Sequence, residues 1–379
     1  MQLALSGRSA LVALRALRAD KTCSIDDLVR GDLPTPDPAP AQRLTRRVIE
    51  SQAGSYYVDD QLEVAVARRE DRVRTKGVSC SVHATALPEG SYLELGGGLW
   101  IPCPELLFVE MGPYLSPVAH QLLGMELCGG YAKPDTYLVP PVTSAEKVRA
   151  YVEELRGMEG LPQARLVAPR LIDNAWSPRE AIIALLARRP TSRLGYGMPP
   201  IVLNSRMVVG DGATRVPDIM FAGTPVGINY EGEGHLDLGG IVSAATEAVL
   251  NPGSPAGQRE LDEQLETVRG KYVDDQRRNR DLLAEGLTVF TVTNEDLLQE
   301  GGLDSVMLQC MTAIKRAGGP DLSRQRHAVL NRLLAHKRQL LIWSLMPGQV
   351  GEEAQAELER EMGGDDWDES QTLDAIVTW

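Results

Sequence analysis

The sequence predicts an α/β protein of the α+β type, and its length, composition and hydrophobic patterning support this. The chain has 379 residues, enough for two or three domains with sizeable cores. Hydrophobic residues make up 43% of it and charged residues 24%, which is typical of a globular protein. Short apolar runs bounded by glycine and proline occur beside longer runs with helical periodicity, so we expect strands and helices together.

Residues 1–76 are expected to form a small, mostly helical N-terminal domain. The predicted elements are helices at 9–19, after the capping box of Ser24 to Asp27, and at 41–50, then a β-hairpin within 56–66. Helices followed by a hairpin are the components of a winged helix, here a degenerate one. Prolines from Pro34 to Pro40 form an extended spacer where that fold has a tight turn, so the alternative of an unrelated helical unit stays open.

Residues 77–170 are predicted to form a short-stranded α/β domain. The expected strands are 78–82, 92–95 and 99–101, followed by helices beginning near Pro104 and Leu115. Gly96-Gly97-Gly98 lacks the Gly-Lys-Ser/Thr and the following helix of a phosphate-binding loop. We therefore interpret these glycines as a hairpin turn.

Residues 171–348 are predicted to form a mixed sheet flanked by helices. The expected order is a helix beginning at Ser177, strands at 201–209, 216–221 and 226–231, a long amphipathic helix at 261–285, a strand at 287–293, and helices at 304–317 and 323–346. Residues 349–379 form an acidic tail that we expect to be disordered, apart from a short helix around 352–361.

The net charge of −13 is unevenly distributed along the chain. Between Glu352 and Asp374 there are ten acidic residues and one arginine, so this segment carries −9 and the rest of the chain −4. A DNA partner is therefore compatible with the composition, although nucleic-acid-binding proteins usually present a basic face. No apolar run is long enough to cross a membrane and no signal peptide is evident, which predicts a cytoplasmic protein without a membrane partner.

Two carboxylates end neighbouring predicted strands. Asp218 follows Pro217, and Glu231 ends the run Ile228-Asn229-Tyr230-Glu231. Side chains so placed are expected to lie side by side at one edge of the sheet. Paired carboxylates can hold a divalent metal ion for phosphodiester hydrolysis.

The order of these motifs resembles the PD-(D/E)XK nuclease superfamily, and in particular its very short patch repair endonuclease-like branch. The resemblance covers roughly 175–300 and rests on Pro217-Asp218, on Asn229-Tyr-Glu231-Gly232 with His235, and on the segment from Asp275 to Gly286. It implies a restriction-endonuclease-like fold that acts on DNA with Mg²⁺.

The resemblance also implies roles for individual residues. Asp218 and Glu231 would hold Mg²⁺, assisted by Glu180 and Asn229, and His235 would transfer a proton. Arg277 and Arg278 would neutralise DNA phosphates. No other cofactor and no particular protein partner is indicated.

The chain departs from the superfamily at two positions. Asn229 stands where a glutamate is usual, and Glu231 stands where a lysine is usual. A neutral amide should weaken metal binding, although the very short patch repair branch also lacks this acid. Two hypotheses therefore stay open: a metal-dependent endonuclease, or a non-catalytic regulator that keeps a degenerate nuclease fold. Asn229, the missing lysine and the acidic balance favour the second. Within residues 78–125, the segment from Val82-His83 to Leu107 is also similar, more weakly, to the C-terminal domain of abortive-infection-type antitoxins.

Each candidate residue also has a purely structural interpretation. Glu180 forms a capping box with Ser177, and Asp218 could satisfy turn amides. Glu231 could be a solvated loop acid and His235 a hydrogen-bonded structural histidine. Basic residues such as Arg277 and Arg278 most often line the solvated face of a helix.

Overall fold

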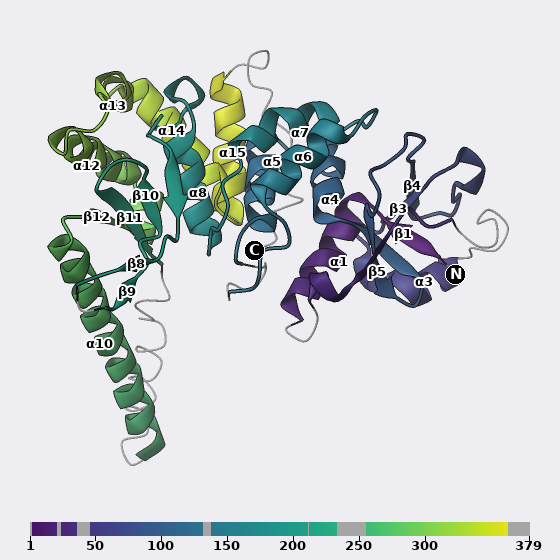
Figure 1. Ribbon diagram of the computed structural model, residues 1–379, viewed down its shortest axis with the longest axis horizontal. Coiled ribbons are helices and arrows are strands. Elements are labelled where there is room, and N and C mark those ends of the chain that lie inside the picture. The colour runs from purple at the N-terminus through teal and green to yellow at the C-terminus, as the bar shows by residue number, and fades with distance from the viewer. Residues whose placement is uncertain are drawn as a thin grey trace. The chain divides into compact units, whose positions relative to one another are not determined.

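The computed structural model describes residues 2–20, 24–35, 46–131, 138–210, 212–232 and 255–362 (Figure 1). The chain divides into two compact units. Unit 1 comprises residues 1–181 with 346–349 and 359–379, and unit 2 comprises 182–345 with 350–358. The expected mixture of helices and strands is confirmed in both units.

Unit 1 is built on one six-stranded sheet of order β2-β5-β6-β1-β3-β4. Its strands are β1 (Leu3–Leu5), β2 (Val29–Gly31), β3 (Leu62–Val66), β4 (Val78–Val82), β5 (Tyr92–Gly96) and β6 (Leu99–Pro102). β1 is an inner strand, parallel to β6 and antiparallel to β3. The sheet therefore joins residues on both sides of position 76.

This topology corrects the expectation of a separate helical or winged-helix domain at 1–76. Three strands from that segment complete the sheet that the later strands enter. β1 and β2 have only three residues each, too few to show an alternating pattern in the sequence. The expected strand at 78–82 is confirmed, and the glycines of the β5–β6 hairpin have positive φ angles of 102°, 62° and 81°.

Two helices of unit 1 lie between strands of the sheet along the chain, and the others follow its last strand. They are α1 (Gly7–Ala19), α3 (Arg46–Ala53), α4 (Pro104–Glu110), α5 (Pro117–Leu127), α6 (Ala145–Glu154) and α7 (Leu161–Val167). All residues of α4 are buried, which places this helix in the core. The helix expected at 41–50 is observed from Arg46 onward, and residues 41–45 lie outside the described segments.

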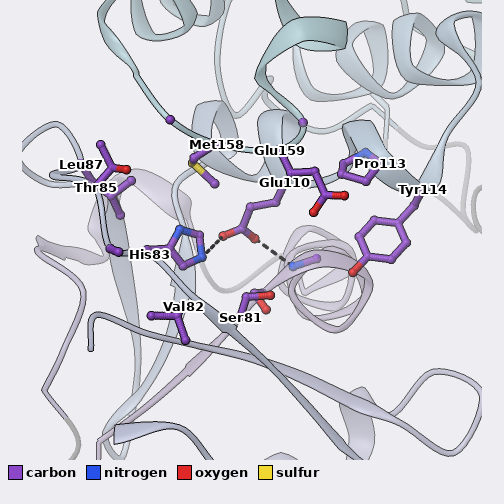
Figure 2. A pocket seen from close by; sticks show the side chains of 15 residues that line it. Ser81, Val82, His83, Thr85, Leu87, Glu110, Pro113, Tyr114, Met158 and Glu159 are labelled. Carbon is purple, nitrogen blue, oxygen red and sulfur yellow. Dashed lines mark hydrogen bonds and ion pairs between the residues drawn. The ribbon is translucent and has the colours of Figure 1, made fainter. Parts of the chain in front are cut away.

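Unit 1 contains a cavity of about 430 Å³ (Figure 2). Its walls come from the start of α1, the residues after β4, the end of α4 and the turn before α7. His83 and Glu110 point toward one another at this cavity.

Unit 2 is built on a four-stranded sheet of order β12-β11-β10-β7. Its strands are β7 (Ile201–Leu203), β10 (Ile219–Phe221), β11 (Val226–Glu231) and β12 (Thr288–Thr293), with a separate hairpin of β8 (Met207–Val208) and β9 (Thr214–Arg215). β10 runs antiparallel to both neighbours, and β11 is parallel to β12. A parallel pair needs a long crossover, and the chain between these two strands includes a 30-residue helix.

The helices around this sheet follow the predicted order. They are α8 (Pro178–Arg188), in which the two units divide, α10 (Pro255–Ala284), α11 (Asn294–Leu298), α12 (Gly302–Arg316), α13 (Ser323–Val329), α14 (Arg332–Ser344) and α15 (Gln349–Met362). The helix expected at 323–346 is split, because Asn331 caps a new helix with its side chain. α15 agrees with the short helix expected near 352–361, whereas 363–379 lie outside the described residues.

No described helix combines the length and apolarity needed to cross a membrane.

Candidate functional site

Asp218 and Asn229 are brought together by the pairing of β10 with β11. Ile219 lies opposite Ile228 in this antiparallel pair, so the residue before β10 meets the residue after Ile228. The Asp218 N–H donates to Asn229 Oδ1 at 3.2 Å, and the Tyr230 N–H donates to Asp218 Oδ2 at 2.5 Å. The sequence predicted that Asp218 and Glu231 lie side by side, and these two hydrogen bonds tie Asp218 to Asn229 and Tyr230, the two residues before Glu231.

Asn229 is an amide buried at the position where a metal-binding acid is usual. Its side chain is 0% exposed, and its Nδ2 has no hydrogen-bond partner among the described residues. Its Oδ1 already accepts the Asp218 N–H. Asn229 thus holds the strand end together and presents a donor, not a negative charge, toward its surroundings.

The other acids of the candidate site are less closely tied to Asp218. Glu231 is the last residue of β11 and is half-buried. Glu180 belongs to the segment of α8 assigned to unit 1, where its Oε2 accepts the Trp176 N–H at 2.9 Å while its own N–H donates to Ser177 Oγ at 3.1 Å. Ser177 therefore caps the helix as the sequence predicted, whereas the Glu180 carboxylate accepts the N–H of Trp176, one residue before the Ser177 N–H that a capping box would use. His235 lies outside the described residues.

These donors do not fit a dedicated Mg²⁺ site within the described part of the chain. One of the two carboxylates, Asp218, is already hydrogen-bonded to a backbone N–H, and the neighbouring amide oxygen is engaged as well. A magnesium ion usually needs one or two freely directed carboxylates together with substrate phosphates. We therefore derive no catalytic step through a metal ion.

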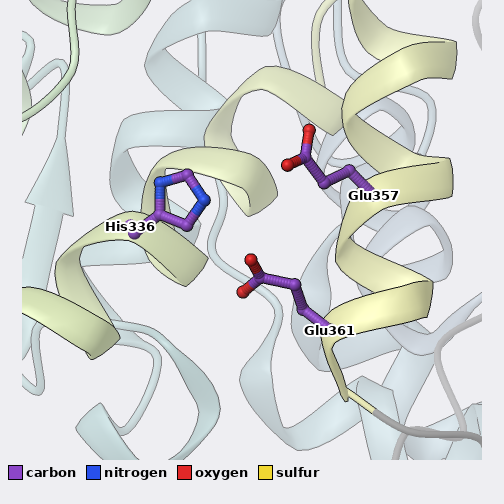
Figure 3. Close-up of side chains that lie close together, drawn as sticks. All are labelled: His336, Glu357 and Glu361. Atoms are coloured by element: carbon purple, nitrogen blue, oxygen red, sulfur yellow. The ribbon is translucent and has the colours of Figure 1, made fainter.

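Figure 3 shows the one other arrangement of potential metal ligands in the described residues, namely His336, Glu357 and Glu361. His336 and Glu357 belong to unit 2, and Glu361 belongs to the segment assigned to unit 1. Both glutamates are exposed. Because exposed acids on a helix are common without an ion, we assign no metal site to this group.

Arg277 and Arg278 are paired with acids of their own helix. Arg277 lies 3.7 Å from Asp274 and Arg278 lies 3.3 Å from Asp275, each one turn earlier on α10. The pair formed by Arg277 is largely exposed, whereas the Arg278 side chain is only 22% exposed. Acidic neighbours therefore offset much of the positive charge expected to face phosphate.

A stronger basic surface lies elsewhere in unit 2, and its residues were not among those predicted from the sequence to contact phosphate. We call it the basic cluster; it consists of Lys315, Arg316, Arg324, Arg326 and Arg332, at the end of α12, on α13 and at the start of α14. All five side chains are exposed, and none forms an ion pair with a described residue. Arg316 and Arg326 also line a cavity of about 650 Å³.

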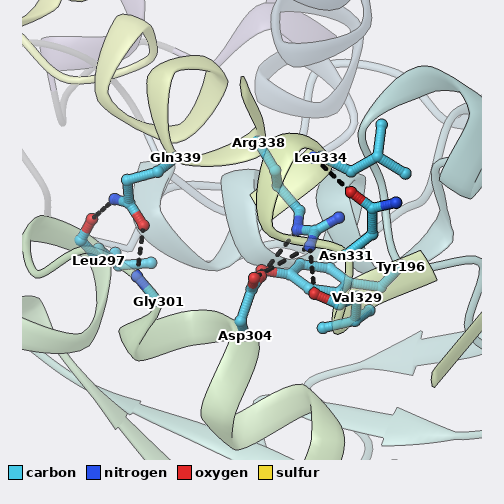
Figure 4. Close-up of polar contacts among 9 residues, drawn as sticks. All are labelled: Tyr196, Leu297, Gly301, Asp304, Val329, Asn331, Leu334, Arg338 and Gln339. Carbon is cyan, nitrogen blue, oxygen red and sulfur yellow. Dashed lines mark hydrogen bonds and ion pairs between the residues drawn. The ribbon is translucent and has the colours of Figure 1, made fainter. Parts of the chain in front are cut away.

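The helices that carry the basic cluster are held by a buried ion pair (Figure 4). Arg338 on α14 donates to both carboxylate oxygens of Asp304 on α12, at 2.7 and 2.9 Å. Tyr196 donates its hydroxyl to the same carboxylate at 2.7 Å. The ion pair thus joins α12 to α14, two of the three helices that carry the basic cluster.

The sequence does contain a signal for the basic cluster. Between Lys315 and Lys337 there are six lysines and arginines and a single acid, Asp321, which gives this stretch a net charge of +5 in a chain of −13. The helical periodicity of this segment identifies its apolar positions but does not show its excess of positive charge. Counting charge in short windows would have identified it.

Comparison with family models, with curated proteins and with solved structures found no match to this chain.

Proposed function

We propose that the chain is a DNA-associated protein in which unit 2 binds DNA on a restriction-endonuclease-like scaffold without hydrolysing it. The observation that carries the proposal is the basic cluster, five exposed cations of which none forms an ion pair with a described residue. Such cations bind phosphates by releasing condensed counterions, independently of sequence. They counteract the repulsion expected from the net negative charge of the whole chain.

The scaffold is supported by the order of elements in unit 2. A helix, three antiparallel strands, a long helix and a strand parallel to the third follow one another, as the resemblance implies. Pro217-Asp218 precedes the middle strand, and Asn229-Tyr-Glu231 ends the next one. This correspondence is an analogy of fold, and function has to be argued from the site itself.

The absence of hydrolysis is supported by the chemistry around Asp218. The residue that usually supplies a second acid is a fully buried amide, and its oxygen accepts the Asp218 N–H. Glu180 is engaged at the start of its own helix. A regulator that recognises DNA needs phosphate contacts and not this acidic site.

A binding titration tests the DNA proposal. We expect the native chain to bind a short duplex with an affinity that falls steeply as salt rises. The triple variant R316S/R324S/R326S should lower the slope of log Kobs against log salt by about 0.9 for each phosphate that the protein no longer neutralises. The variant R277S/R278S/R280S removes the same charge from α10 and serves as the matched control, with a smaller expected change.

Plasmid nicking tests the hydrolysis hypothesis separately. We expect supercoiled DNA to remain intact with the native chain in Mg²⁺ or Mn²⁺. Metal-dependent nicking that disappears in D218A would instead establish the endonuclease, with Asp218, Glu231 and His235 as the residues to examine next.

In the binding titration, equal salt slopes for both triple variants and the native chain would refute DNA binding through the basic cluster.

A further inference from the structure

The cavity of unit 1 has two buried ionisable side chains in its wall (Figure 2). His83 directly follows β4, and Glu110 is the last residue of α4. Each side chain is 5% exposed. The imidazole Nε2 lies 3.4 Å from Glu110 Oε1, and neither atom forms a hydrogen bond with a described residue. Two polar atoms buried to this extent without partners indicate a place for a ligand group.

Glu110 has one hydrogen-bond donor and no cation. Its Oε2 accepts the Gly7 N–H at the start of α1, at 2.8 Å. The nearby arginine, Arg8, is engaged with Glu63 and Asp59, each at 2.7 Å. The cavity lining contains no lysine or arginine and a second acid, Glu159. The lining therefore offers no cationic side chain to compensate the charge of a phosphate or another anion.

The protonation of the pair follows from its burial. Burial raises the pKa of Glu110 to about 8, a rise that the Gly7 N–H opposes and Glu63 increases. Burial lowers the pKa of His83 to about 4. At neutral pH the imidazole is neutral and the carboxyl is mostly protonated. The titratable groups that face Glu110 or border the cavity are Glu63 on β3, His83 after β4, Tyr92 on β5, Tyr114 after α4, Tyr151 on α6 and Glu159 before α7.

An ionised Glu110 and a neutral His83 would form a pair of acceptors. The carboxylate Oε1 and the imidazole Nε2 are close enough for one nitrogen with several N–H groups to donate to both. Hydroxyls of Ser6, Ser81 and Thr85 lie among the lining residues as further polar groups. A metal ion is less suitable, because no third histidine, cysteine or acid among the described residues brings a ligand atom within 4.8 Å of both atoms of this pair.

We propose that this cavity binds a small molecule through a primary ammonium group, which donates to Glu110 Oε1 and His83 Nε2. The positive charge compensates the buried carboxylate, and the proton of Glu110 leaves when the cation enters. The volume of about 430 Å³ suits a ligand of metabolite size. The proposal concerns unit 1 and is independent of DNA binding by unit 2.

Calorimetric titration with putrescine tests the proposal, with 1,4-butanediol as the uncharged analogue. Putrescine should bind, and its affinity should rise by up to about tenfold per pH unit below the pKa of Glu110, because the ligand competes with a proton. In two buffers of different ionisation enthalpy, the native chain should release close to one proton per putrescine bound near pH 6.5. The diol should not bind.

Two variants locate the binding. E110Q keeps an acceptor for the Gly7 N–H but removes the charge, so it should lose putrescine binding and the proton release. E153Q changes an exposed acid of α6 outside the cavity and should bind like the native chain. Absence of putrescine binding, equal binding of the diol, or binding without proton release would each overturn the proposal on the native chain alone. Unchanged binding by a folded E110Q would do the same.

Discussion

Arg338 and Glu110 are buried ionisable residues that meet the cost of desolvation in different ways. Arg338 is 0% exposed but is paired with both oxygens of Asp304, and its guanidinium lies 5.1 Å from the centre of the Tyr196 ring. Glu110 is buried beside a neutral imidazole and no cation. A buried charge is tolerated when its hydrogen bonds and its counter-charge are supplied, and otherwise it is neutralised by protonation. The first residue is therefore structural, whereas the second is available for binding.

The stability of unit 1 should depend on pH through Glu110 and His83. The folded pKa of Glu110, about 8, lies above the ordinary value of 4.5, so the folded state binds more protons and stability falls as pH rises between these values. The folded pKa of His83, about 4, lies below 6.5, so stability rises between 4 and 6.5. The two effects oppose one another up to pH 6.5, and above it only that of Glu110 remains.

We therefore expect the free energy of unfolding to fall between pH 6.5 and 8, by at most about 1.4 kcal/mol per pH unit. Urea unfolding of the native chain and E110Q across this window measures it, and E110Q should lack this part of the decline. Parallel pH profiles for the two proteins would contradict the assignment.

At the scale of the element, the start of α1 organises the acids of unit 1. The Gly7 N–H donates to Glu110, and the Arg8 N–H donates to Glu63 at 2.7 Å. Unpaired N–H groups at a helix start favour carboxylates in this way. Gly7 has a φ of +50°, and a Cβ there would lie 2.2 Å from Glu63 Oε2. Both the backbone angle and the space require glycine.

Two glycine-to-alanine changes should have opposite signs. G7A should destabilise the fold by about 1–3 kcal/mol, because alanine is strained at this φ and displaces Glu63. G270A lies within α10, where nothing is within 4 Å of a new Cβ, and it should stabilise that helix by about 0.5–1 kcal/mol. Thermal unfolding followed by circular dichroism compares them. A G7A variant that unfolds at the same temperature as the native chain would show that the start of α1 tolerates a side chain.

At the scale of the whole molecule, charge is separated along the chain. The stretch from Lys315 to Lys337 carries +5, whereas residues 363–379 contain five acids and no lysine or arginine. At low salt, an acidic segment of the same chain can be attracted to the basic cluster and so compete with DNA phosphates for it. The acidic segment is therefore expected to weaken DNA binding by the basic cluster.

Deletion of residues 363–379 changes the net charge from −13 to −8 and leaves α15 intact. If unit 2 binds DNA, the shortened chain should bind more tightly at low salt, and the difference should vanish as added salt screens the charges. A chain with a neutral glycine-serine segment of equal length is the control and should match the deletion. Equal affinity of all three chains at low salt would exclude such competition.

The sequence by itself determined the elements whose signals are local. The strands at 78–82 and 226–231, the glycine turn after β5 and the cap that Ser177 provides for the Glu180 N–H were all predictable, because neighbouring residues specify them. Only the tertiary structure decided which distant strands share a sheet, as with the three-residue β1 between β6 and β3. It also decided that His83 meets Glu110, and that the Asn229 oxygen accepts the Asp218 N–H. These contacts depend on strand order and burial, which local propensity does not encode.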